Sequence, residues 1–200
     1  MQQPDYDRRL DDALESAEAL FAEKGFHGAS MRDIARAAGV SVAGLYYYLP
    51  SKQLALYLVC NRIFDRLEAG TTTLASIEDP VVRLETFVRE HLRFMIGNPD
   101  AYRVLLHDMD VLELQHGRDL HARRRRYFAV AAQLIHALAQ RSGLTPPRLA
   151  TAALFGMLNW APMWYRRDLD GDVDGLASKV LTIFLHGVAP ATPVVAEVAS

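Results

Sequence analysis

The sequence predicts an all-α protein, with an N-terminal module of three helices followed by a larger helical bundle. Two observations support this fold class. Apolar residues recur at every third or fourth position over most of the chain, which is the spacing of an amphipathic helix. From Ser51 onward no stretch alternates apolar and polar residues as a half-buried strand does, and glycines, prolines and capping residues divide the chain into helix-sized segments.

The composition indicates a globular protein of the cytoplasm. Half of the 200 residues are apolar, and the net charge of -2 argues against a general nucleic-acid coat. The first ten residues, MQQPDYDRRL, are too polar for a signal peptide, and the single cysteine, Cys60, suits a reducing compartment. The most apolar stretch, Leu149 to Tyr165, contains Asn159 and Pro162 and is too short to cross a membrane. We therefore expect no membrane association.

The first two helices follow from their apolar spacing and their end signals. Apolar residues over Leu10–Phe21 share one helical face, and Gly25 supplies a stop. Ser30 can cap the next helix, MRDIARAAG, which ends at Gly39. A short helix that ends in a glycine turn is the first half of a helix-turn-helix.

The third helix lies in SVAGLYYYLPSK, where Ser41 can act as the cap and Tyr48 is the last residue. Consecutive residues of a helix point about 100° apart, so a single core cannot bury all three tyrosines. At least one ring must therefore lie on the surface. The dipeptide PS and Lys52 then open a fourth helix.

The rest of the chain reads as longer helices with clear boundaries. We expect helices from Asp79 to Gly97, from Pro99 onward, from about Gly117 to Ser142, from about Pro147 to Arg166 and from Val173 to His186. The stretch from Leu149 to Tyr165 is apolar nearly all round, so one face needs a partner outside its own bundle. A homodimer would bury that face. The candidate interface residues are Leu154, Leu158, Leu176, Val180, Ile183 and Phe184.

The third helix has the chemistry of a DNA recognition helix. Its first residues are small and permit close approach to the major groove, where Val42 can meet a thymine methyl group. Hydroxyl groups, basic groups and helix starts nearby suit phosphate contacts. The candidate DNA-binding residues are Ser30, Arg32, Ser41, Val42, Ala43, Gly44, Tyr46, Tyr47 and Lys52. The alternative is a small helical subdomain with surface tyrosines.

These residues closely resemble the DNA-binding module of the TetR family of transcriptional regulators. The shared patterns are F-x-x-x-G-F over Phe21–Phe26, R-D-I-A-x-x-A-G-V-S over Arg32–Ser41 and L-Y-x-x-L-x-S-K over Leu45–Lys52. The resemblance implies that Tyr46 and Tyr47 contact phosphates. The chain departs from the common pattern at Val42, Tyr48 and Leu49, so the base preference is not transferred.

The resemblance also implies a division of the chain. Residues 1–50 would form the helix-turn-helix DNA-binding domain, residues 51–188 the ligand-binding and dimerisation domain, and residues 189–200 a flexible tail. The stretches NPDAYRVLLHD and LNWAPMWYRRD resemble family members that respond to acyl-CoA or related lipid and steroid catabolites. An acyl-CoA effector is therefore one expectation, and another apolar or aromatic molecule is the alternative.

The candidate pocket residues are aromatic or unexpectedly polar residues on inward helical faces. They are Phe87, His91, Phe94, Tyr102, Arg124, Tyr127, Phe155, Asn159, Trp160 and Trp164. His91 interrupts an apolar stripe, and Asn159 is the one amide in an apolar helix. Each also has a simpler interpretation as part of the core, since buried polar groups are normally hydrogen-bonded. Within the run Arg123–Arg126, most side chains belong to a solvated face.

The sequence contains no convincing pattern for a metal site or a catalytic site. DLDGDVDG resembles the start of a calcium loop, but Leu181 stands where the loop needs glutamate. The histidines of HDMDVLELQHGRDLH match no zinc spacing. No nucleophile and base stand in a catalytic pattern, and there is no phosphate loop. We expect no enzyme activity, cofactor or metal.

The sequence thus predicts a homodimeric regulator, most simply a repressor, that binds operator DNA and is released by a small apolar or acyl-CoA effector. The alternative is a helical dimer that sequesters a ligand and carries a vestigial DNA-binding module. The operator, the effector and the choice between repressor and activator stay open.

Overall fold

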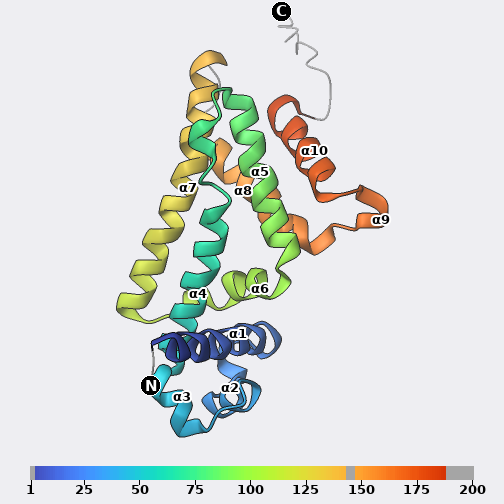
Figure 1. Ribbon diagram of the computed structural model, residues 1–200. Helices are drawn as coiled ribbons and strands as arrows, with labels where there is room; N and C mark the ends of the chain where they lie inside the picture. Colours follow the sequence, from blue (N-terminus) through green and yellow to red (C-terminus); the bar gives the residue numbers. More distant parts are fainter. Residues whose placement is uncertain (1–2, 143–146, 188–200) are drawn as a thin grey trace, which may run out of the picture.

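The computed structural model describes residues 3–142 and 147–187, and over these ranges it consists of helices without strands (Figure 1). The all-α prediction is confirmed. None of the helices within the described ranges is long and apolar enough to cross a membrane. The predicted tail, residues 189–200, lies outside the described residues.

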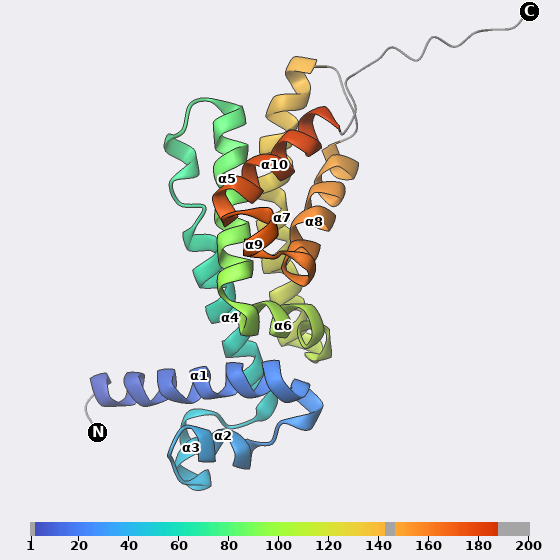
Figure 2. The ribbon, with the colours of Figure 1, turned by 90° about the vertical axis from the view of Figure 1, so that its right-hand side faces the viewer.

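The N-terminal module contains α1 (Gln3–Gly28), α2 (Met31–Ala37) and α3 (Val42–Tyr48). In Figures 1 and 2, α1 lies across one end of the bundle, and α2 and α3 pack on its outer side. Phe21, Ile34 and Leu45 are almost fully buried and join the three helices in one core. The module is therefore held by apolar packing from every helix.

The first helix is longer than its apolar stripe predicts, since it begins before Leu10. The predicted stop at Gly25 is a kink, because this residue has φ of +69° and the helical turn continues to Gly28. A positive φ suits glycine, which has no Cβ to clash.

The bundle is formed by the longer helices of the chain. Its elements are α4 (Lys52–Ala69), α5 (Pro80–Gly97), α6 (Pro99–His107), α7 (Leu114–Ser142), α8 (Pro147–Trp164) and α10 (Val173–His186), with the short helices η1 (Leu74–Ser76), η2 (Met109–Val111) and α9 (Arg167–Asp170). The helix α4 leads from the N-terminal module into the bundle, and α6 lies between α1 and the other helices (Figure 1). The helix α10 packs across α5 (Figure 2).

The predicted helix bounds are close, with three differences. The helix α7 begins at Leu114 instead of Gly117, and α8 ends at Trp164 instead of Arg166. The short helix α9 was not predicted, because its four residues are too few to show a periodic pattern.

The predicted dimer face needs correction. Leu154, Leu158, Leu176 and Val180 are at most 5% exposed, because they pack into the core of their own chain. They leave almost no surface for a partner. Ile183 is exposed and Phe184 is half-buried. The exposed apolar side chains of α8, α9 and α10 are instead Leu149, Trp160, Met163, Trp164, Leu169 and Ile183. Four of the six predicted interface residues are thus buried within their own chain, and of the six only Ile183 is exposed.

Candidate nucleic-acid interface and ligand cavity

The helix α3 divides its residues between the core and the surface. Leu45 and Tyr48 are buried, whereas Val42, Tyr46 and Tyr47 are exposed by 38%, 47% and 68%. Ala43 is exposed beside them. One of the three consecutive tyrosines is thus a core residue, and the other two present their rings to the outside.

Two serine caps fix the starts of α2 and α3. The Ser30 hydroxyl oxygen accepts a hydrogen bond from the Asp33 amide at 3.2 Å, and the Ser30 amide donates to the Asp33 carboxylate at 3.2 Å, which completes a capping box. The Ser30 hydroxyl donates to the same carboxylate. This bond from Ser30 holds the pKa of Asp33 below its ordinary value. Ser41 accepts from the Gly44 amide at 3.0 Å. The Ser30 hydroxyl is therefore committed within its own turn.

Gly44 has a local reason for its small size. A Cβ at this position would lie 3.1 Å from the Ser41 hydroxyl oxygen, tighter than an ordinary contact. The glycine therefore leaves room for the cap, apart from any requirement of DNA.

Lys52 ties the start of α4 to the end of α1. Its ammonium group donates to the carbonyl oxygens of Phe26 at 2.7 Å and Ala29 at 2.9 Å, and lies 4.3 Å from the centre of the Phe26 ring. Two of its three hydrogens are thus used within the protein. Arg32 is exposed on α2.

Tyr6 also belongs to this surface and was not among the predicted DNA-binding residues. Its ring centre lies 5.9 Å from that of Tyr47, edge to face, and 4.9 Å from that of Tyr48. Such aromatic pairs fix ring orientation. Local patterns cannot show a contact between residues some forty positions apart in the chain.

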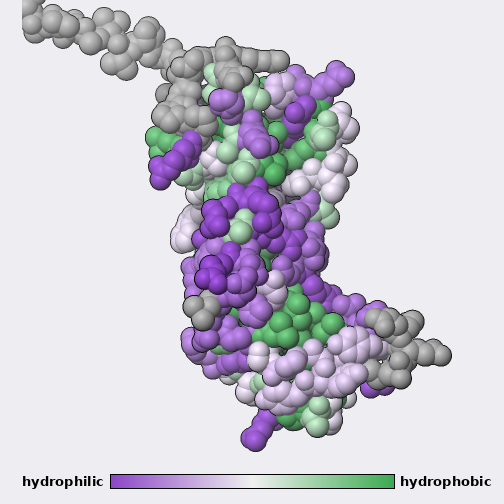
Figure 3. Space-filling view, turned by 90° about the vertical axis from the view of Figure 1, so that its left-hand side faces the viewer, coloured by the Kyte–Doolittle hydropathy of each residue, from purple (hydrophilic) through white to green (hydrophobic). Residues whose placement is uncertain are grey.

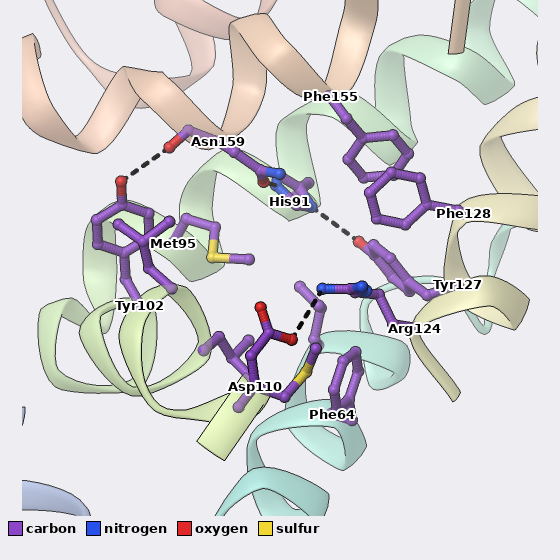
Figure 4. A pocket seen from close by; sticks show the side chains of 14 residues that line it. Phe64, His91, Met95, Tyr102, Asp110, Arg124, Tyr127, Phe128, Phe155 and Asn159 are labelled. Atoms are coloured by element: carbon purple, nitrogen blue, oxygen red, sulfur yellow. Dashed lines mark hydrogen bonds and ion pairs between the residues drawn. The ribbon is translucent and has the colours of Figure 1, made fainter. Parts of the chain in front are cut away.

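The bundle contains a cavity of about 450 Å³, open on one side, between α4, α5, α6, η2, α7 and α8 (Figure 4). Its lining is mainly apolar. The lining residues are Phe64, Leu67, His91, Met95, Tyr102, Leu105, Leu106, Met109, Asp110, Arg124, Tyr127, Phe128, Phe155 and Asn159. The volume falls within the range of about 300–1,000 Å³ that is typical of small-molecule sites.

Part of the predicted pocket set lines this cavity. His91, Tyr102, Arg124, Tyr127, Phe155 and Asn159 are lining residues. The other predicted residues are not. Phe87 is a buried neighbour of Tyr127 and Phe155, and Phe94 lies under the Arg66 guanidinium.

Trp160 and Trp164 lie outside the cavity, on the exposed face of α8. The sequence also missed the lining residues of α4 and η2, together with Met95, Leu105, Leu106 and Phe128. Their apolar side chains resemble ordinary core positions in the sequence.

A chain of hydrogen bonds lies at the closed side of the cavity. His91 is 1% exposed, with Nδ1 at 3.1 Å from the Tyr127 hydroxyl and Nε2 at 3.2 Å from Asn159 Oδ1 (Figure 4). The Tyr102 hydroxyl donates to the Asn159 backbone oxygen at 2.9 Å.

Burial keeps these groups uncharged. It lowers the pKa of His91 to about 4, although the bond to Asn159 opposes the shift. Burial also raises the pKa of the Tyr127 hydroxyl above its ordinary value. The closed side is therefore polar and neutral at physiological pH.

The charged groups lie at the open side. Arg124 is 3.9 Å from Asp110, and their side chains are 45% and 74% exposed. His121 is 3.7 Å from the same carboxylate. In Figure 4 the Arg124–Asp110 pair lies across the cavity from Asn159. An ion pair this loose and exposed contributes little to stability, so its groups are available to a ligand.

The arginine run of α7 is mostly a solvated face, as expected. Arg124, Arg125 and Arg126 are exposed, and the side that carries α4 and α7 is largely hydrophilic at mid-height (Figure 3). Arg123 instead binds both carboxylate oxygens of Glu68 at 3.0 and 2.7 Å and reaches Asp65. These bonds, first of all that to Glu68, raise the pKa of Arg123 above its ordinary value.

A polar contact joins the cavity wall to the N-terminal module. Asp108, 6% exposed, accepts a hydrogen bond from the Phe26 amide at 3.0 Å. The next two residues, Met109 and Asp110, line the cavity. The cavity and the end of α1 are thus one residue apart along the chain.

The acidic residues of the calcium-like stretch have structural roles. Asp172 caps α10 by accepting from the Gly175 amide at 2.7 Å, and Asp174 pairs with Arg93 at 2.6 Å. Over residues 3–142 and 147–187, no group of three or more His, Cys, Asp or Glu side chains is placed to hold a metal ion.

Curated relatives match part of the chain. The regulator RutR of Escherichia coli (strain K12) is 31% identical over 96 residues, 48% of this chain and 45% of RutR. The transcriptional activator FasR of Mycolicibacterium smegmatis is 35% identical over 54% of this chain and 50% of its own length. The repressor KstR of the same organism is 34% identical over 43% of each. The chain thus matches about half the length of these relatives or less.

Solved structures match nearly the whole fold. A TetR-family transcriptional regulator from Bordetella parapertussis 12822 superposes with a TM-score of 0.81 at 28% identity, covering 90% of this chain and 95% of the other. AibR, solved with isovaleryl coenzyme A and operator DNA, gives a TM-score of 0.79 at 24% identity, covering 88% and 97%. At that identity AibR shows a shared fold alone.

Two family models match the chain in succession. The model of bacterial regulatory proteins of the tetR family matches residues 13–54, and the C-terminal domain model of the tetracyclin repressor type matches residues 78–188, more than half of the chain. The family consists of transcriptional regulators, which agrees with the expectation that the chain is not an enzyme. The chain belongs to the TetR family of transcriptional regulators.

Proposed function

We propose that this regulator binds operator DNA as a homodimer, represses transcription in the cytoplasm and leaves the DNA when a small apolar or acyl-CoA effector occupies the cavity. The observation that carries the proposal is the combination of an exposed face of α3 and a cavity whose lining residue Met109 follows Asp108, which is bonded to the N-terminal module. Residues 1–50 would read DNA, and residues 51–188 would bind the effector and the second subunit.

At the DNA, the exposed residues of α3 have distinct roles. Val42 and Ala43 would approach base edges, while Tyr46, Tyr47 and the Ser41 hydroxyl would donate to phosphates. Arg32 would add a charge contact. Gly44 and Ser30 shape the helix starts, and Lys52 has one ammonium hydrogen left for a phosphate.

The second subunit would cover the exposed apolar face of α8 and α10. Trp160, Met163 and Trp164 lie on α8, and Ile183 lies on α10. Large exposed apolar side chains that lie together are typical of an interaction surface. A two-fold dimer would place two copies of α3 on one side of the assembly, as two operator half-sites about 34 Å apart require.

The effector class and the direction of regulation are proposed from the cavity and from the relatives. AibR is described with isovaleryl coenzyme A, and stretches of this chain resemble members that respond to acyl-CoA. The cavity of about 450 Å³ suits an acyl chain but is too small for the whole of coenzyme A, which would extend past Arg124. The curated relatives include the repressor KstR and the activator FasR. Repression is the simpler mechanism, because it needs no contact with polymerase.

Effector binding would reach the DNA through η2. A ligand against Met109 and Asp110 displaces the segment that begins at Asp108, and with it the bond to Phe26 at the end of α1. The two copies of α3 would then no longer match successive major grooves. Linkage requires that effector and operator weaken each other's binding by equal factors.

The test is fluorescence anisotropy of the purified protein on its own upstream DNA at about 0.15 M salt, with and without a panel of acyl-CoA thioesters. We expect sequence-selective binding that one thioester releases. The Tyr47→Ala variant should lose at least tenfold in operator affinity, and the Tyr165→Ala variant, changed far from α3, should not.

Other outcomes separate the alternatives. Selective binding that no thioester weakens keeps the regulator and rejects the acyl-CoA effector. Binding no better than to random DNA, on this and on genomic fragments, rejects the operator and supports the ligand-sequestering dimer.

A further inference from the structure

The closed side of the cavity carries polar groups that the packing of the bundle does not require. His91, Tyr127 and Asn159 come from three different helices and meet in a wall formed otherwise by apolar side chains such as Met95 and Phe155 (Figure 4). His91 and Tyr127 are buried and Asn159 is half-buried, and burying a polar group costs free energy unless the group is hydrogen-bonded. We call these residues the triad.

The hydrogen bonds of the triad have a direction, because a neutral imidazole has one donor and one acceptor. In one arrangement the Tyr127 hydroxyl donates to Nδ1 of His91, and Nε2–H donates to Asn159 Oδ1. The Asn159 amide hydrogens then have no partner among the described residues and are left for a ligand in the cavity.

The opposite direction requires that the Asn159 amide turns over and that His91 takes its other tautomer, with the ring proton on Nδ1 instead of Nε2. Its nitrogen then donates to Nε2, Nδ1–H donates to the Tyr127 oxygen, and the Tyr127 hydroxyl hydrogen is released. In this state Asn159 presents an acceptor and Tyr127 a donor. The triad can therefore match either a carbonyl oxygen or a hydroxyl group without any change of charge.

A charged group of a ligand would bind poorly at the triad. The titratable groups at the closed side, His91, Tyr102 and Tyr127, are buried and neutral, and the cation among the lining residues, Arg124, lies at the open side. A carboxylate at the triad would lose its hydration without gaining a counter-ion, which is costly. The same carboxylate at Arg124 would keep both water and a partner.

We propose that the triad selects effectors that carry a neutral carbonyl or hydroxyl group on an apolar chain, with any anionic group held outward at Arg124. This rests on the proposed role of the cavity as the effector site. The effector class is thereby narrowed to oxygenated apolar molecules, such as ketones, alcohols and oxidised acyl chains. A plain hydrocarbon chain would leave the triad without a partner on the cavity side.

The test uses isothermal titration of the full-length protein with three probes of equal chain length, 2-octanone, 1-octanol and octanoate, at pH 7. We expect both neutral probes to bind at least tenfold more tightly than octanoate. The Tyr127→Phe and Asn159→Ala variants should weaken the neutral probes by at least tenfold. Tyr165→Phe, which removes a hydroxyl far from the cavity, is the matched control and should change nothing.

A spectroscopic measurement distinguishes recognition from mere structural support. The infrared carbonyl stretch of bound, ¹³C-labelled 2-octanone should lie at lower frequency than in hexane and return toward the hexane value in Asn159→Ala. Melting temperatures of all variants show whether each one is folded.

Three results would each overturn the proposal: octanoate binding as tightly as the neutral probes, neutral probes bound equally by wild type and by both variants, or no binding of either neutral probe. The operator assay is independent of these titrations, so loss of DNA binding and loss of ligand selectivity are separate failures.

Discussion

His91 is a titratable side chain that the fold holds in its neutral form. Its pKa is about 4 in the folded protein and about 6.5 in an unfolded chain. Between these values the unfolded state binds a proton that the folded state does not, so the free energy of unfolding falls as the pH falls. The contribution of His91 is complete above about pH 6.5 and is lost progressively toward pH 4.

This linkage gives a pH prediction. From pH 7 to pH 5, His91 should remove about 2 kcal/mol of stability, since each pH unit below 6.5 costs about 1.4 kcal/mol. Urea unfolding of wild type and of His91→Gln at both values isolates the effect, because all other groups contribute alike. Equal losses in the two proteins would show that His91 titrates normally in the folded state.

Tyr6 gives a prediction about DNA binding. If its ring orients Tyr47 on the surface of α3, Tyr6→Ala should weaken operator binding severalfold, whereas Tyr6→Phe keeps the ring contact and the affinity. Anisotropy titrations at one salt concentration provide the comparison. Equal operator affinities for Tyr6→Ala and wild type would show that Tyr6 contributes only to packing and not to DNA binding.

At the scale of the elements, the end of α1 depends on a kink that only glycine adopts easily. Gly25→Ala should cost about 1–2 kcal/mol, because an alanine at φ of +69° is strained. Gly97→Ala is the control, since a Cβ there meets nothing within 4 Å and its φ is not positive. Chemical unfolding of both variants measures the difference, and equal stabilities would mean that α1 relaxes around the change.

The contact between α4 and α7 depends on Arg123, whose side chain is 13% exposed. Replacing Arg123 with Ala should cost about 2 kcal/mol, because Glu68 loses a charged hydrogen-bond partner. Arg126→Ala, three residues further along the exposed side of α7, should change stability by less than about 0.5 kcal/mol. Thermal unfolding of the two variants measures both losses of stability. Equally small losses would show that water replaces Arg123 as the partner of Glu68.

The elements themselves were largely predictable, because periodic apolar stripes and end signals are local. The stripe of α5, with Phe87 and His91 on one face, is buried as expected. It was harder to predict which face of each helix packs against the core of the chain. Leu154 and Leu158 share their helix with Trp160, and the sequence does not say which face meets the chain's own core.

The cavity was also only partly predictable, because the sequence does not show how the helices pack. Residues that were chemically unusual for their helix, such as Asn159 and Arg124, were found from the sequence. Phe64 and Met109 were missed because a cavity is a property of how helices pack, and these side chains carry no local sign of it. Asp108 could not be paired with Phe26, which lies 82 positions away.

For the whole molecule, Asp108 is the contact through which cavity and DNA-binding module would influence each other. Asp108→Ala should reduce the ratio of operator affinities without and with effector toward one, whereas Asp108→Asn, which keeps an acceptor for the Phe26 amide, should retain most of it. The anisotropy assay with the effector that it identifies gives both ratios. An unchanged ratio in Asp108→Ala would place the coupling in other contacts of α6 with α1.

The exposed face of α8 has a spectroscopic consequence. The chain has two tryptophans, and both are solvent-exposed there and absent from the cavity lining. If the second subunit covers this face as proposed, their intrinsic emission should move to longer wavelength on dilution, because the subunits separate and the indoles meet water. A ligand in the cavity touches neither indole, so in the proposed dimer a spectral change on adding ligand would report a change in subunit association and not occupancy of the site itself.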